Sequence, residues 1–131
     1  MKLLERLGAQ PWALPLARAA FWIALLGVFV AAEIPDKDHP PDLFGWDKAN
    51  HFFAFWVLSV LGAGAFPRRS LIALGLWLSG FGALIELVQM LPFIHRDADP
   101  IDWLTDTVAV LAALAPVLLA RWRALFPPRQ S

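Results

Sequence analysis

The chain has 131 residues, of which 59% are hydrophobic and 17% charged, and its mean hydropathy is +0.58. A disordered chain needs the opposite balance, and a soluble domain of this length cannot bury so much apolar surface in its own interior. Basic and acidic residues each number 11, so the net charge is zero and we expect no nucleic-acid partner. The absence of cysteine excludes disulfides and thiolate chemistry. The composition therefore indicates a protein whose solvent is a lipid bilayer.

Four apolar stretches follow one another along the chain, separated by breaks rich in proline and charge. They predict helices at about residues 17–34, 49–66, 71–93 and 101–122. Each stretch is close to the length of about 20 residues that a helix needs to cross a hydrocarbon core. We therefore expect an all-α, polytopic membrane protein: a compact bundle of four transmembrane helices that forms a single domain over residues 1–131. The first stretch also has features of a cleavable signal peptide, but the long segment before it and Arg18 beside it favour a retained helix.

Basic residues in the short connections predict the orientation of the bundle, because such residues stay on the cytoplasmic side. Eight of them fall on one side: Lys2, Arg6, Arg18, Arg68, Arg69, Arg121, Arg123 and Arg129. The other side carries Lys37, Lys48 and Arg96, together with an acidic loop. We therefore expect both termini to be cytoplasmic and the acidic side to face outward.

Ionisable residues inside the spans fall at the ends that would face outward. They are His51 in the second span, Glu86 in the third, and Asp102 and Asp106 in the fourth, with Gln89 beside them. Spacings of three or four residues place Asp47 with His51, Glu86 with Gln89, and Asp102 with Asp106 on shared helix faces. A charged group in mid-bilayer costs about 3 kcal/mol on insertion scales, so such residues are rare in spans and usually have a function. We therefore interpret these residues as a functional site.

Several of these polar residues also have structural interpretations. Asp99, which precedes Pro100, has the pattern of a helix N-cap, and Asp47 can cap the second helix in the same way. Gln89 can form a hydrogen bond between helices, and His51 can be a neutral histidine at the interface. These alternatives remain open at the level of the sequence.

Three short motifs occur in order between about residues 46 and 113. The segment Asp47-Lys48-Ala49-Asn50-His51-Phe52 resembles the DKxxHF opening of VanZ-like membrane proteins. Gly82, Glu86 and Gln89 resemble the GxxxExxQ segment of that family, and Arg96, Asp99, Asp102 and Trp103 resemble the stretch that leads into its last helix. Asp106 departs from the asparagine most often found there, and Ala109 departs from a glycine.

The resemblance implies a small protein of the bacterial cell envelope, located in the cytoplasmic (inner) membrane. The member that gave the family its name is associated with low-level teicoplanin resistance, and relatives are common in bacteria where they have no resistance role. The family is proposed, by analogy, to resemble intramembrane enzymes that act on phosphate-bearing lipid or lipid-linked headgroups. The expected partner is thus a membrane lipid or a lipid-linked precursor.

The first functional hypothesis is an intramembrane transferase or hydrolase that acts on a lipid headgroup at the outer leaflet. His51 would be the nucleophile or general base. Glu86, the deepest ionisable group of the third span, would be the general acid or would orient His51. Lys48 and Arg96 would bind phosphate oxygens, with Gln89 as a further substrate-binding residue.

Asp47, Asp102 and Asp106 would support this site, and carboxylates of this kind are suited to a hard divalent cation such as Mg²⁺. The main alternative is a non-catalytic protein that binds lipid or antibiotic in the same cavity, for which Glu86→Gln should be tolerated. A proton-coupled transporter is the third hypothesis, but it needs ionisable groups across the whole membrane, and the inner halves of the spans lack them. The sequence leaves the substrate, the metal and the oligomeric state open.

Overall fold

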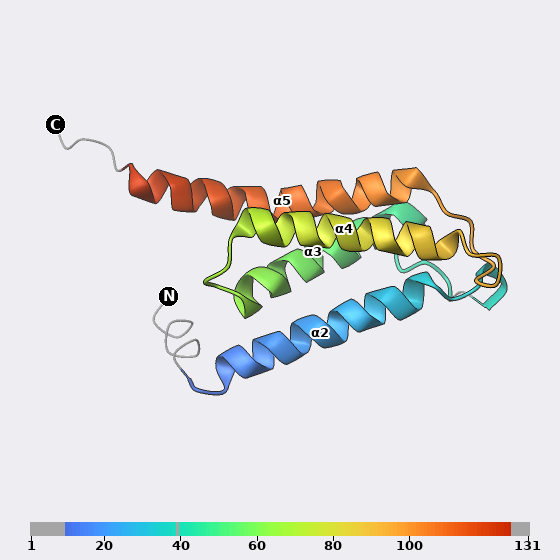
Figure 1. Cartoon of the computed structure of the whole chain (residues 1–131), viewed down its shortest axis with the longest axis horizontal. Coiled ribbons are helices and arrows are strands. Elements are labelled where there is room, and N and C mark those ends of the chain that lie inside the picture. Colours follow the sequence, from blue (N-terminus) through green and yellow to red (C-terminus); the bar gives the residue numbers. More distant parts are fainter. Residues whose placement is uncertain (1–9, 39, 127–131) are drawn as a thin grey trace.

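A computed structural model describes residues 10–38 and 40–126, and within these residues the chain forms four long helices and no strand (Figure 1). The helices are α2 (Ala13–Ala32), α3 (Asp47–Ala65), α4 (Leu71–Gln89) and α5 (Pro100–Leu125), with a 3-10 turn η1 (Asp36–Asp38) after α2. The chain runs up and down, so the α2–α3 and α4–α5 connections lie at one end of the bundle (Figure 1). The α3–α4 turn lies at the other end, where α2 begins and α5 ends. The prediction of an all-α bundle of four helices is confirmed.

The observed helix ends differ from the predicted ends for local reasons. Helix α4 stops at Gln89, although the apolar stretch continues to Phe93, because Pro92 has no amide proton to extend the helix. Helix α5 begins as predicted: the side chain of Asp99 accepts a hydrogen bond of 2.9 Å from the Ile101 amide, and Pro100 occupies the first turn. The same helix continues beyond its predicted end, to Leu125.

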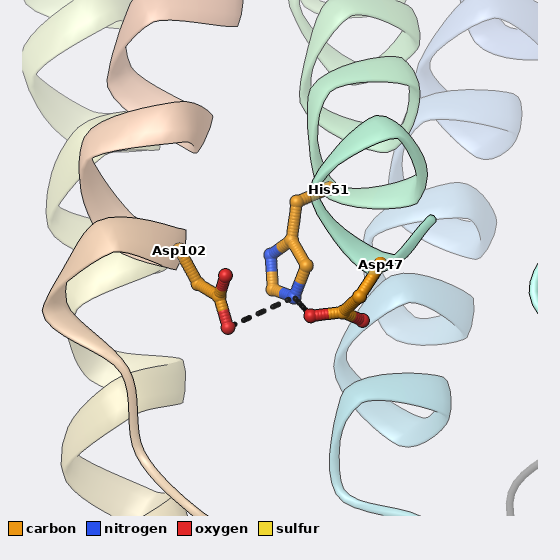
Figure 2. A group of neighbouring side chains, drawn as sticks. All are labelled: Asp47, His51 and Asp102. Carbon is orange, nitrogen blue, oxygen red and sulfur yellow. Dashed lines mark ion pairs between the residues drawn. The ribbon is translucent and has the colours of Figure 1, made fainter. Parts of the chain in front are cut away.

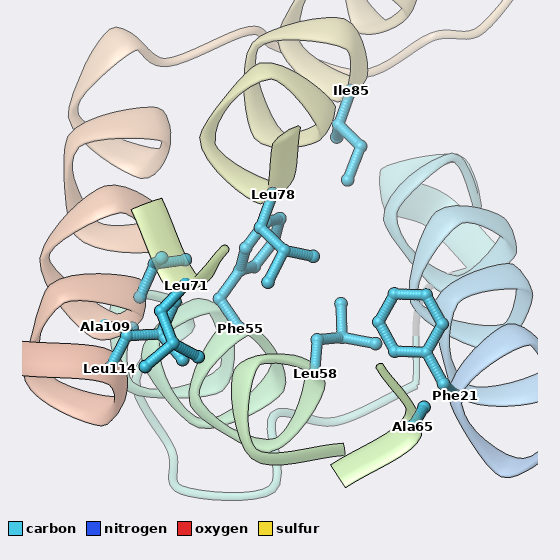
Figure 3. Close-up of a cluster of buried hydrophobic side chains, with 10 residues drawn as sticks. Phe21, Phe55, Leu58, Ala65, Leu71, Leu78, Ile85, Ala109 and Leu114 are labelled. Atoms are coloured by element: carbon cyan, nitrogen blue, oxygen red, sulfur yellow. The ribbon is translucent and has the colours of Figure 1, made fainter. Parts of the chain in front are cut away.

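Helix α3 is the central element, because it packs against each of the other three helices. The core lies along it and contains ten buried apolar side chains (Figure 3). Phe21, Phe55, Leu58, Leu78 and Ile85 are each at most 1% exposed. Helices α4 and α5 are further joined by a 2.8 Å hydrogen bond between the hydroxyl groups of Ser79 and Thr107.

Three of the described helices, α2, α4 and α5, are long and apolar enough to cross a membrane. Large apolar side chains remain exposed along their outer faces, such as Ile23, Leu26, Ile72, Leu76, Leu104 and Leu111. A bilayer would cover these surfaces, which a soluble monomer rarely leaves exposed. Helix α3 is less apolar because its first two turns contain Asp47, Lys48 and His51.

The described basic residues of the predicted cytoplasmic side lie at one end of the bundle. Arg18 lies near the start of α2, Arg68 and Arg69 lie in the α3–α4 turn, and Arg121 and Arg123 lie near the end of α5. Lys2, Arg6 and Arg129 lie outside the described residues. The positions of the described basic residues agree with the predicted sidedness. The cytoplasmic location of this end itself stays a prediction.

Candidate functional site

The polar residues singled out from the sequence meet at the end of the bundle that holds the α2–α3 and α4–α5 connections. Helix α3 supplies three of them from its first two turns, α4 supplies one near its end, and α5 supplies the others from its cap and first two turns. We call this group the carboxylate–histidine cluster: Asp47, Lys48, His51, Glu86, Asp99, Asp102 and Asp106. Asp106 is fully buried, Asp102 is 5% exposed and Glu86 is 8% exposed. The predicted convergence of three helices on one site is therefore present in the fold.

His51 is held between α3 and α5 by carboxylates on both sides of its ring. Its Nδ1 atom lies 3.0 Å from Oδ1 of Asp106, a hydrogen-bond distance. Its Nε2 atom lies 3.7 Å from Oδ2 of Asp102 and 3.9 Å from Oδ2 of Asp47, as Figure 2 shows. The contact between Nδ1 and Asp106 leaves Nε2 directed toward the other two carboxylates.

Lys48 joins the start of α3 to the start of α5. Its ammonium group donates to Oδ2 of Asp99 at 2.8 Å and to Oδ1 of Asp102. The hydrogen bond from Lys48, followed by that from the Ile101 amide, lowers the pKa of Asp99 below its ordinary value. Because the ammonium group of Lys48 already donates to two carboxylates, it has less capacity to bind phosphate oxygens, the role that we expected for it.

Glu86 contacts the cap of α5 and makes no hydrogen bond to His51. Its Oε2 atom accepts a 2.8 Å hydrogen bond from the backbone amide of Asp99. Its Oε1 atom is buried and has no hydrogen-bond partner among the described residues. Of the two roles that we gave Glu86, general acid or orienting His51, the second is thus filled by Asp106, which makes the contact to the imidazole.

Gly82 allows α4 to approach α5 at the level of Asp106. A Cβ atom at this position would lie 2.9 Å from Oδ2 of Asp106 and 3.4 Å from a ring carbon of Phe55. A distance below 3.0 Å essentially never occurs for real Cβ atoms, so a side chain here would displace Asp106. The glycine of the GxxxExxQ segment therefore has a packing role that the motif alone did not reveal.

An apolar cavity of about 230 Å³ opens beside the cluster. Its apolar walls include Val28 of α2, Ala54 of α3 and Ile85 of α4, and the α2–α3 loop lies over it. Its polar lining residues include His51 and Arg96. The cavity thus combines an apolar chamber with access to the imidazole.

The remaining predicted residues have clear positions. Arg96 lies at the cavity, where its positive charge opposes the effect of burial, which raises the pKa of the nearby Glu33. Gln89 is turned toward α2, and its side-chain amide donates a 3.0 Å hydrogen bond to the carbonyl oxygen of Ala32. This contact is the interhelical hydrogen bond that we gave as the alternative to substrate binding.

The two capping alternatives have opposite outcomes. Asp99 caps α5, as described above, and it also contacts Lys48 and Glu86, two contacts that the capping pattern did not predict. Asp47 does not cap α3: the cap position is Trp46, which makes no side-chain cap hydrogen bond. Asp47 instead lies in the first turn of the helix, with its carboxylate toward His51.

A scan against protein-family models and searches of curated proteins and of solved structures find no match to this chain. The resemblance to VanZ-like proteins therefore stays a prediction from the three motifs. What is known of the site comes from the arrangement of its side chains.

Proposed function

We propose that this protein acts on a phosphate-bearing lipid or lipid-linked headgroup at the outer leaflet of a bacterial inner membrane. The observation that carries the proposal is the position of His51, which touches both the buried carboxylates and the apolar cavity. A lipid has the same division into a polar head and an apolar tail. Binding sites for such molecules combine apolar walls with a few convergent polar groups.

The roles of individual residues follow from their contacts. Asp106 holds the imidazole of His51 through Nδ1, and His51 also lines the cavity that would take the lipid. A histidine oriented by a carboxylate in this way is suited to proton transfer or to stabilising charge on a reacting group. Glu86, which has one carboxyl oxygen without a hydrogen-bond partner within residues 10–38 and 40–126, is the second candidate for proton transfer. Arg96, which lines the cavity, is suited to pairing with phosphate oxygens.

The location of the cluster favours this proposal over a proton-coupled transporter. Such a transporter needs ionisable groups along the whole path through the membrane. The buried ionisable side chains of the described residues, Glu86, Asp102 and Asp106, all lie at one end of the bundle. A headgroup site at one interface requires no more than this.

The test is a profile of lipids and lipid-linked precursors in cells that lack the chain or carry a single form of it. The forms are the wild type, Glu86→Gln and His51→Asn, with His95→Asn as the matched control because His95 is exposed and outside the cluster. We expect one lipid species to change in the deletion strain and in both cluster variants, and to be normal with the control. Immunoblots of the membrane fraction establish that all forms are present at equal levels.

Two results would refute catalysis. One is a normal lipid profile in cells that carry Glu86→Gln at wild-type levels. The other is a deletion strain with an envelope defect but unchanged lipids. Both results favour the alternative of a non-catalytic protein that holds a lipid or an antibiotic in the same cavity.

A further inference from the structure

The Nε2 atom of His51 faces a small gap that is bordered by carboxylates from two different helices. Asp47 contributes from α3 and Asp102 from α5, and one ligand atom from each of the three side chains lies within 4.8 Å of the others. Figure 2 shows the imidazole between the two carboxylates, with Nε2 toward both. The gap lies next to the apolar cavity, which Asp47 and His51 also line.

The distances across this gap exceed those of hydrogen bonds. Nε2 lies 3.7 Å from Asp102 and 3.9 Å from Asp47, whereas N–H···O bonds are about 2.7–3.2 Å long. Ligands at about 2.0–2.2 Å from a tetrahedral Zn²⁺ ion lie about 3.3–3.6 Å apart. The two nitrogen–oxygen distances therefore need to shorten by only a few tenths of an ångström to reach metal-ligand spacing, and all three ligand atoms already lie within 4.8 Å of one another.

The charge of the cluster also favours a cation. Among the described residues it contains five carboxylates, whereas its only permanent cation is Lys48, and Arg96 lies at the adjacent cavity. Buried carboxylates without compensating charge are strongly unfavourable. Oε1 of Glu86 is also buried and has no hydrogen-bond partner in the part of the chain that the structure describes. Glu86 is 8% exposed and experiences the charges of His51, Asp102 and Asp106.

We propose that Asp47, His51 and Asp102 bind one divalent transition-metal ion, for which Zn²⁺ fits best. The imidazole nitrogen in the set favours such an ion over Mg²⁺, which prefers oxygen ligands and was our expectation from the carboxylates alone. Asp106 is then an outer-shell residue and not a ligand, because its hydrogen bond to Nδ1 fixes the ring and leaves Nε2 for the metal. Three protein ligands leave a fourth position open, as in catalytic zinc sites.

The metal site stands on side-chain geometry and does not require the proposed activity on lipids. If both proposals hold, His51 acts as a ligand, and Glu86 keeps the role of proton transfer. The two proposals are separable because metal binding is measured on purified protein without any lipid substrate.

The test is the binding of Zn²⁺ to the full-length protein, purified in detergent without a histidine tag and stripped with a chelator. We expect one Zn²⁺ per chain by competition with a chromophoric chelator. His51→Asn should abolish this binding, and Asp47→Asn and Asp102→Asn should weaken it at least a hundredfold. Asp106→Asn should weaken it by about ten- to hundredfold, the usual effect of an outer-shell partner.

The matched controls are His95→Asn and Asp38→Asn, which make the same changes at exposed positions outside the cluster. Both should bind Zn²⁺ as the wild type does. X-ray absorption of the Zn²⁺-loaded wild type provides a measurement that needs no variant, and we expect one imidazole nitrogen with oxygen ligands. Substoichiometric binding by the wild type, unchanged binding by His51→Asn, or a zinc ion with only oxygen ligands would overturn the proposal.

Discussion

Replacing Gly82 by alanine tests whether the close approach of α4 to Asp106 organises the cluster. The added Cβ atom would lie 2.9 Å from Oδ2 and 3.3 Å from Cβ of Asp106, and 3.4 Å from a ring carbon of Phe55. Asp106 is fully buried, and its other carboxylate oxygen contacts His51, so it cannot move away without breaking that contact. Gly80 provides a matched control on the same helix, because a Cβ atom there meets nothing within 4 Å.

The expected magnitudes have opposite signs at the two positions. Alanine is more favourable than glycine inside a helix by about 0.5–1 kcal/mol, so Gly80→Ala should stabilise the fold by that amount. At Gly82 the same gain is opposed by overpacking, which costs about 1–3 kcal/mol, and by the loss of a hydrogen bond to a charged group, worth about 1.5–3 kcal/mol. Because the helix-propensity gain is the same at both positions, the two costs remain, and we expect Gly82→Ala to be less stable than Gly80→Ala by about 2.5–6 kcal/mol.

Thermal unfolding in detergent micelles, followed by tryptophan fluorescence, measures this difference between the two purified variants. We expect a melting temperature below that of the wild type for Gly82→Ala and at or above it for Gly80→Ala. Equal melting temperatures for the two variants would refute the argument that Gly82 is required by the proximity of Asp106.

Three further predictions concern residues around the cluster. Burial raises the pKa of Glu33, so the contribution of Glu33 to stability is complete below the ordinary pKa of 4.5 and is lost as the pH rises through the raised pKa. Glu33→Gln should therefore raise the melting temperature near neutral pH and leave it unchanged in acid. A gain in melting temperature that is independent of pH would contradict this cause. Lys48→Met leaves the buried carboxylate of Asp102 without its partner and should lower the free energy of unfolding, measured with a chemical denaturant, by about 3 kcal/mol. Lys37→Met removes an exposed ion pair and should lower it by about 1 kcal/mol or less. Equal losses would show that burial has no influence on the strength of these pairs. Gln89→Leu removes the hydrogen bond to the carbonyl oxygen of Ala32 in α2 and should lower the stability by about 1 kcal/mol, while Zn²⁺ binding is retained. A loss of Zn²⁺ binding in a folded variant would instead place Gln89 in the metal site.

The sequence predicts the candidate site well at the level of residues and poorly at the level of contacts. Asp47 and His51 share a face because they are four residues apart, and this relation holds in any helix. The partner of His51 is different: orienting His51 was one of the two roles that we gave Glu86, whereas the contact is made by Asp106. That choice depends on how α4 and α5 are rotated about their axes, which no local pattern specifies.

Four helices, their order and the confinement of His51 and the buried carboxylates to one end were determined by the sequence itself. These features depend on the length and hydropathy of each stretch and on residue spacing, which are local properties of the chain. The pairing of Lys48 with Asp99 and Asp102, and the turn of Gln89 toward α2, were decided only by the tertiary structure. Each of these contacts joins residues about 50 positions apart or more, so it forms only after the helices have packed, and the distances that frame the proposed metal site depend on that packing.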